Sequence, residues 1–170
     1  MILYHVDRMS TLQDDQTIQL IKPPLPSWKL EETLNELYPD GITKHGCRYL
    51  LRSLKGLHTS NCIEQIFELY RQLYFPDKPS RFQSFFCFGK CEQANDFYAE
   101  HRRRFGEAKI VKIDTGDAKH HIGNMRLLTG ETILQCHENA MNYWKGTLTP
   151  DSIQEVLVVP PVKVVGRLTP

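Results

Sequence analysis

One glutamate stands at the start of an apolar segment near the end of the chain. Glu155 directly precedes Val156 and a run of branched apolar residues that is typical of a buried strand. A carboxylate at a strand end either is solvated or points into a site. In a site, it can stabilise positive charge developing on a sugar or accept a proton from an incoming nucleophile. Glu155 is therefore the first candidate catalytic residue.

Two further candidates lie in other strand-like segments. His5 lies near the end of an apolar run at residues 2–6, and Ser84 lies in the aromatic-rich segment 82–88. A histidine in a buried strand either is a satisfied core residue or holds a ligand hydroxyl. The phenylalanines around Ser84 either fill the core or stack on a ligand ring.

Helices are expected to separate these strands. Apolar residues at helical spacing begin at Trp28, with Ser27 as the N-cap, and recur over residues 63–73, with Ser60 or Asn61 as the cap. Further helices are expected near Tyr49 and over 92–104 and 132–144. Single helices between strands, without regular strand–helix–strand alternation, predict an α+β fold rather than a doubly wound sheet.

The remaining strands are predicted from alternation and from proline punctuation. Strands are expected over residues 17–21 and 109–114, and the polar, glycine-containing stretch 115–124 is expected to be a loop. Residues 155–159 and 162–168 are expected to form a hairpin-like pair around two prolines.

Composition limits the class of protein. The chain has 170 residues, of which 41% are hydrophobic, and this predicts a single domain over residues 1–170. A formal net charge of +1 gives no global field that would attract nucleic acid or a membrane. Five cysteines, no basic and apolar leader, and no apolar run of roughly 20 residues favour a cytoplasmic protein that does not span a membrane. We expect a monomer.

Three segments, in this order, resemble motifs of the ADP-ribosyltransferases. Tyr4-His5-Val6 resembles the first-strand motif of the histidine-using branch, which includes diphtheria-toxin-like and poly-ADP-ribose enzymes. Residues 80–86 resemble the intermediate strand. Residues 152–161 resemble the final motif, in which a glutamate precedes a Val-Leu-type strand and a proline-containing turn. The resemblance covers the strand framework, whereas the helices between residues 28 and 75 match no known part of the family.

The resemblance implies a split mixed or antiparallel sheet core with flanking helices, and NAD as the substrate. His120-His121 with Cys136 and His137 could suggest a metal site, but adjacent histidines point in different directions and no pair at metal-ligand spacing accompanies them, so no metal is expected. Glu155 would stabilise the ribose cation, His5 would hold a ribose hydroxyl, and Ser84 would support the glutamate or the nicotinamide amide. Arg8 and Arg81 either pair with the NAD diphosphate or form structural ion pairs. The implied NAD contacts are His5, Val6, Arg8, Arg81, Phe82, Ser84 and Phe85.

The sequence departs from the family at two positions. Val6 stands where many members have glycine, and Ile153 stands where members that modify arginine have a second acid. An arginine-directed protein transferase is therefore disfavoured. The acceptor of ADP-ribose is either protein or nucleic acid, and the basic run 101–104 either grips phosphates or forms a solvated helix end.

The resemblance implies a mono-ADP-ribosyltransferase that acts as a toxin or host-modifying factor, with an antitoxin or immunity partner. Two alternatives stay open. One is an NAD glycohydrolase, in which water is the acceptor. The other is a non-catalytic binding or immunity module on the same scaffold.

Overall fold

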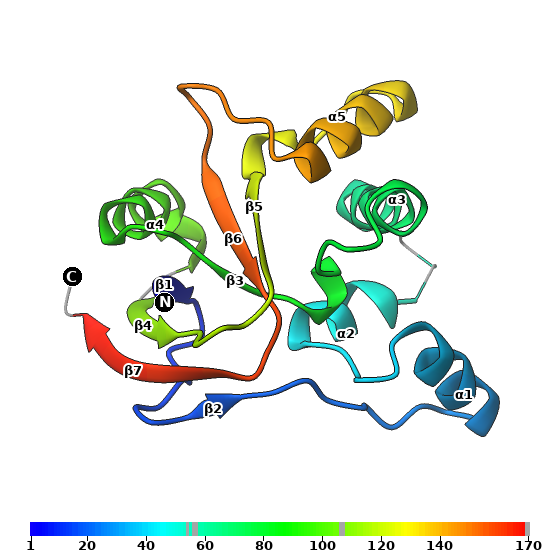
Figure 1. Ribbon diagram of the computed structural model, residues 1–170, viewed down its shortest axis with the longest axis horizontal. Helices are drawn as coiled ribbons and strands as arrows, with labels where there is room; N and C mark the ends of the chain where they lie inside the picture. The colour runs from blue at the N-terminus through cyan, green and yellow to red at the C-terminus, as the bar shows by residue number, and fades with distance from the viewer. Residues whose placement is uncertain (54, 56–57, 106–107, 169–170) are drawn as a thin grey trace.

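Two antiparallel sheets form in the computed structural model, which describes residues 1–53, 55, 58–105 and 108–168 (Figure 1). The first sheet has the order β1-β4-β7-β2, formed by Ile2–Asp7, Lys109–Asp114, Val162–Leu168 and Thr17–Ile18 respectively. The second has the order β3-β6-β5, formed by Phe85–Cys87, Gln154–Val158 and His120–Asn124. The neighbouring strands in both sheets run antiparallel. Together with the helices, the sheets confirm the predicted α+β class.

The two sheets meet at Tyr4 of β1 and Phe88, the residue after β3. The N–H of each residue donates to the carbonyl of the other, at 2.9 and 2.7 Å. Because alternate residues of a strand point to the same face, Val156 and Val158 of β6 pack together in a core cluster with residues of the first sheet, including Leu3. Leu157 lies between these two valines and therefore points away from that cluster.

Two helices cover the face of the second sheet that carries Leu157. α3 (Thr59–Tyr74) and α5 (Ile133–Lys145) form a core cluster with Leu157 through Phe67, Tyr143 and other apolar side chains. The indole N–H of Trp144 donates to the carbonyl of Phe67 at 2.7 Å, which fixes α5 against α3.

The remaining helices pack on other parts of the strand framework (Figure 1). α4 (Cys91–Phe105) packs on the outer face of β1, where Phe97 joins a cluster with Val6. α1 (Trp28–Leu37) and α2 (Lys44–Leu50) gather around Phe82, which belongs to the short 3-10 helix η1 (Arg81–Gln83). A second 3-10 helix, η2 (Met125–Leu127), follows β5.

Side-chain caps begin two of the longer helices. Ser27 accepts a hydrogen bond from the backbone N–H of Leu30 at the start of α1, as predicted. Thr132 caps α5 in the same way. The predicted cap of α3 is wrong, because the helix begins at Thr59 with His58 as its N-cap and without a side-chain hydrogen bond there.

Three sequence predictions are corrected by the structure. Residues 120–124 form β5 rather than a loop. β6 and β7 do not form a hairpin, because the turn between them carries the chain from the second sheet to the first. The expected strand over 82–88 is divided, since η1 occupies its first part and β3 its later part.

Among the described residues, the helices are too short or too polar to cross a bilayer.

We predict that Gly123→Ala destabilises the fold by about 1–3 kcal/mol, the usual cost of overpacking a core. A Cβ at this position of β5 would overlap the ring of Tyr143. Urea unfolding followed by circular dichroism measures the change. Gly89→Ala is the matched control, because the nearest atom to its new Cβ is the flexible Oε1 of Gln93 at 3.9 Å. Equal stability of the two variants would contradict the predicted clash.

Candidate functional site

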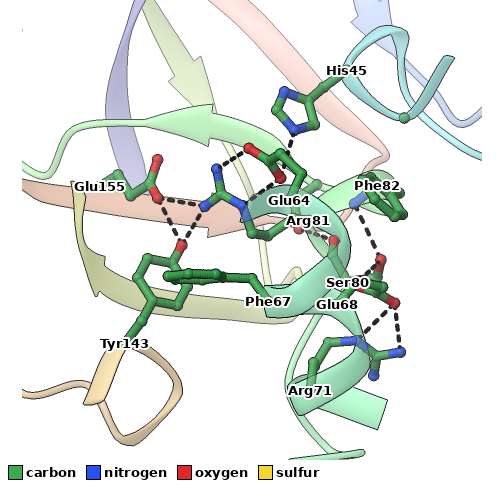
Figure 2. A network of polar contacts seen from close by, with 12 residues as sticks. His45, Glu64, Phe67, Glu68, Arg71, Ser80, Arg81, Phe82, Tyr143 and Glu155 are labelled. Atoms are coloured by element: carbon green, nitrogen blue, oxygen red, sulfur yellow. Dashed lines mark hydrogen bonds and ion pairs between the residues drawn. The ribbon is translucent and has the colours of Figure 1, made fainter. Parts of the chain in front are cut away.

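A buried arginine joins two glutamates that are far apart in the sequence. Arg81 is 2% exposed, and its Nε and Nη2 donate to the two carboxylate oxygens of Glu64 at 2.8 and 2.9 Å. Its Nη1 donates to Oε1 of Glu155 at 2.5 Å and to the hydroxyl of Tyr143 at 2.6 Å. The Tyr143 hydroxyl donates to the same Oε1 at 2.7 Å. Figure 2 shows that one guanidinium thus holds both carboxylates.

Four elements supply this network. Glu64 comes from α3, Arg81 begins η1, Tyr143 comes from α5, and Glu155 is the second residue of β6. The planar guanidinium lies over two rings, 4.9 Å from the centroid of Phe86 and 5.3 Å from that of Tyr143. Through its hydrogen bonds and ring contacts, Arg81 therefore connects α3 and α5 to β6, the strand that carries Glu155.

The charges in the network are fixed by its members. Burial alone would raise the pKa of Glu64, but Arg81 and His45 beside it hold that pKa well below its usual range. Burial alone would lower the pKa of Arg81, but Glu155 and Glu64 raise it well above its usual value. Burial raises the pKa of Tyr143 well above its usual value, so its hydroxyl stays a donor at neutral pH.

His45 lies beside the network without completing it. Its Nε2 is 3.2 Å from Oε2 of Glu64, which is close enough for an ion pair if the ring is protonated. The same nitrogen is buried and is not aligned for a hydrogen bond. We therefore treat His45 as a packed neighbour, whose ring also contacts Phe86 at a centroid distance of 4.4 Å.

Glu155 uses one of its two carboxylate oxygens in these contacts. The side chain is almost fully buried, and Arg81 and Tyr143 both donate to Oε1. Within the described part of the chain, Oε2 accepts no hydrogen bond. It is also not completely enclosed by protein atoms. An ionised carboxylate has about four acceptor positions, so Oε2 can accept from a ligand hydroxyl.

His5 occupies the boundary between the two sheets. Its Nδ1 is 2.7 Å from the carbonyl of Phe86 and donates to it, because a carbonyl only accepts. Its ring lies on Phe85 with a centroid distance of 4.3 Å. Burial lowers the pKa of His5 to about 4, so the ring is neutral at pH 7 and Nε2 carries the lone pair.

His5 and Glu155 lie on different faces of the strand framework. His5 shares its face of β1 with Leu3, which packs between the sheets. Glu155 shares its face of β6 with Leu157, which packs against α3 and α5. The structure therefore does not join the two side chains directly, and their hydrogen bonds go to different partners.

A cavity of about 600 Å³ opens beside the network. Its lining includes Arg8 after β1, Arg48 of α2 and Arg52 shortly after α2. Tyr49 and Phe97 add aromatic rings, Glu64 forms part of the wall, and His58 and Ser60 line it from the start of α3. The cavity thus combines three guanidinium groups, aromatic surface and one carboxylate of the network.

The other predicted contact residues are buried elsewhere. Ser84 is enclosed and its hydroxyl donates to the carbonyl of Ser80 at 2.7 Å. Phe82 and Val6 belong to core clusters, and Phe85 packs on His5. Arg81 has its donors engaged by the two glutamates and Tyr143 rather than open to a diphosphate.

Of the predicted NAD contacts, Arg8 is the one that lines the cavity. From the basic run 101–104, His101 also lines it, while the side chains of residues 102–104 lie outside the described ones. The histidine, cysteine and acidic side chains described form no group of three suited to a metal ion.

Sequence reasoning missed Glu64 and the cavity arginines of the α2 region. A signal for Glu64 exists, because it follows Ile63 and precedes Phe67 on the buried side of α3, so a carboxylate interrupts the apolar face. Glu68 repeats the pattern one turn later, where it accepts from Arg71 at 2.9 Å and from Ser80 at 2.9 Å. Glu68 is not among the residues that line the cavity.

Comparison with protein families identifies the family of the chain. A family described as "Protein of unknown function (DUF2441)" matches residues 3–169. The chain belongs to the DUF2441 family. The matched range extends from β1 to β7 and contains the complete network of Glu64, Arg81, Tyr143 and Glu155. Comparison with curated proteins finds no match.

We predict that stability falls as the pH is lowered from about 6.5 to about 4. Burial lowers the pKa of His121 to about 4, and its ring donates from Nε2 to the carbonyl of Tyr143 at 3.0 Å. Below pH 6.5 the unfolded chain binds protons at His5 and His121 that the folded chain does not, so acidification favours unfolding. For His121 alone the full effect is roughly 3 kcal/mol.

Urea unfolding at pH 7, 6 and 5 tests this prediction above the range in which Glu64 takes up protons. His121→Gln keeps a donor for the Tyr143 carbonyl and should reduce the dependence of stability on pH, leaving the part that comes from His5. His120→Gln changes the exposed neighbour and should leave the dependence as in the wild type. An unchanged slope in His121→Gln would show that this histidine does not govern the acid sensitivity.

Proposed function

We propose that this chain is a cytoplasmic ADP-ribosyltransferase that cleaves NAD and transfers ADP-ribose to a macromolecule. The observation that carries the proposal is the basic cavity directly beside the network that holds Glu155. The ordered resemblance of the segments around His5, Ser84 and Glu155 supports it. So does the arrangement of β1, β3 and β6 in two antiparallel sheets that meet at one edge.

The cavity suits the chemistry of an adenosine diphosphate group. Arg48 and Arg52 carry planar donors of the kind that bind phosphate oxygens in pairs, and the guanidinium of Arg8 adds positive charge to the same lining. The start of α3 lacks a side-chain cap, so its first N–H groups and positive dipole end favour an anion. Tyr49 and Phe97 can pack on a base.

Glu155 would act on the nicotinamide ribose. Cleavage of the bond to nicotinamide sends the bonding pair to the leaving base and develops oxocarbenium character on the sugar. A nucleophilic atom of the acceptor then bonds to that carbon and loses its proton. Oε2 of Glu155 would accept from a ribose hydroxyl and stabilise the positive charge, while Arg81 and Tyr143 hold Oε1.

NAD is long enough to contact both His5 and Glu155, although these two side chains do not touch. A dinucleotide has two ribose rings joined by a diphosphate, so two side chains can bind one molecule without touching. The neutral ring of His5 would accept a hydrogen bond at Nε2 from an O–H or N–H group of the ligand. Glu64 lines the cavity and Glu155 lies on the other side of the Arg81 guanidinium, so a ligand that reaches both carboxylates has to extend past Arg81.

A non-catalytic binding module is the second candidate. Glu155 is only 3% exposed, and an acid enclosed by Arg81 and Tyr143 is also what a purely structural network requires. Release of nicotinamide from NAD distinguishes the two candidates. Transfer of label from ³²P-NAD to protein or nucleic acid of a cell extract then identifies the acceptor class, and release without transfer indicates a glycohydrolase. An acceptor or immunity protein would be a separate partner of the chain.

We predict that Glu155→Gln lowers nicotinamide release by about 10²- to 10⁴-fold. Glutamine keeps the size and the acceptor oxygen but removes the charge that opposes the sugar cation. The apparent affinity for NAD should change much less, because that charge develops after binding. Chromatographic assay of nicotinamide measures the rate, with exposed Glu138→Gln as the charge-matched control. A Glu155→Gln rate near the wild-type rate would reject the mechanism.

We also predict that NAD raises the melting temperature of the Glu155→Gln variant, in which turnover is suppressed. The proposed site combines elements from β1 to β6 and therefore exists only in the folded chain. At about 100 times the dissociation constant, the stabilisation is about 2.7 kcal/mol. Scanning calorimetry with and without NAD measures it, and nicotinamide alone is the control ligand. An unchanged melting temperature at millimolar NAD would count against an NAD site.

A further inference from the structure

One carboxylate forms part of the wall of an otherwise basic cavity. Glu64 is the member of the arginine network that lines the cavity, and its side chain is 8% exposed. The nearby Arg48 and Arg52 would attract phosphate groups, whereas a carboxylate repels them. The cavity therefore has an acidic position and a basic region, and it favours a ligand that has both hydroxyl donors and phosphates.

Glu64 has acceptor capacity left for such donors. Arg81 uses one acceptor position on each oxygen, and His45 lies near Oε2 without a hydrogen bond. An ionised carboxylate offers about four positions. Because His45 Nε2 lies 3.2 Å from Oε2, the position that stays open is on Oε1. Because Arg81 keeps Glu64 ionised at neutral pH, the side chain can only accept, and O–H groups are its natural partners.

The orientation of Glu64 is fixed before any ligand arrives. The two-point contact with Arg81 holds both oxygens, and Arg81 is itself held by Glu155 and Tyr143. A prepositioned carboxylate loses little conformational freedom on binding, which favours affinity and selectivity. Neighbouring hydroxyl groups of a ribose are two donors on one side of a sugar, and either of them can donate to the acceptor position that Arg81 leaves open on Glu64.

We propose that Glu64 is a specificity-determining residue that accepts a hydrogen bond from a ribose hydroxyl of a nucleotide in this cavity. The nucleotide phosphates lie against the arginines, with Arg48 as the contact to be tested. The inference rests on the proposed function in taking NAD as the natural ligand. It does not require that NAD be cleaved.

Binding of ADP and of 2′,3′-dideoxy-ADP to the complete chain, measured by calorimetry, tests the proposal. The wild type should bind ADP at least about 10-fold more tightly than 2′,3′-dideoxy-ADP, because one hydrogen bond to a charged group supplies about that factor. In Glu64→Gln this ratio should shrink. Arg48→Gln should weaken both ligands equally and leave the ratio unchanged, because the phosphates are common to them.

Glu68→Gln is the matched control, since Glu68 is a buried, arginine-bound acid on the same helix but does not line the cavity. It should keep the wild-type ratio even if its melting temperature falls. Should Glu64→Gln fail to fold, the comparison of the two ligands on the wild-type chain can still overturn the proposal. Equal binding of both by the wild type, an undiminished ratio in Glu64→Gln, or no binding of ADP at millimolar concentration would each overturn the proposal.

Failure of this proposal and failure of the proposed function give different results. A chain that prefers ADP through Glu64 yet releases no nicotinamide keeps the ribose contact and rejects the transferase. A chain that cleaves NAD but binds both ADP forms equally rejects the ribose contact alone.

Discussion

The buried guanidinium of Arg81 is the constraint on which the site depends. A protonated guanidinium away from water needs acceptors for its donors, and it finds them on α3, α5 and β6. Those elements must therefore stand at fixed distances from η1, which carries the arginine. The apolar contacts of Phe67, Tyr143 and Leu157 allow many small adjustments of helix on sheet. The directed hydrogen bonds of Arg81 restrict these adjustments.

Two carboxylates share this one guanidinium, so the network contains more acidic than basic groups. Arg81 offers one positive charge to Glu64 and Glu155. Burial of the excess negative charge is costly unless positive groups lie nearby. Arg81 and His45 are the positive groups that lower the pKa of Glu64, and the arginines of the cavity lining add further positive charge to the same region. A ligand in this cavity would therefore place its phosphates against the arginines of the lining and its hydroxyl donors against Glu64.

Sequence patterns within a short segment predicted features that depend on neighbouring residues, such as helix caps. They did not predict features that depend on contacts between distant parts of the chain. Ser27 and Ser84 illustrate the difference, because the first caps its own helix as predicted, whereas the contacts of the second depend on η1, which the sequence did not suggest. β5 was hidden because its alternation is inverted, with Ile122 exposed and His121 buried. The arginine network was also hidden, since Arg81 is 17 residues from Glu64 and 74 from Glu155. The resemblance pointed to Glu155 without indicating what holds it.

The edge of β3 explains why histidine suits position 5. Backbone groups of alternate residues point to the same edge, so Phe86 and Phe88 both face β1. Phe88 pairs with Tyr4, but the carbonyl of Phe86 is met by the ring of His5 instead of by the backbone. This contact satisfies an edge carbonyl that would otherwise lack a partner. It also fixes the proton on Nδ1 and leaves a lone pair on Nε2, which burial keeps unprotonated. Lysine or arginine could donate to Phe86 but would offer no acceptor, whereas the neutral ring of His5 carries a donor and an acceptor in one rigid plane.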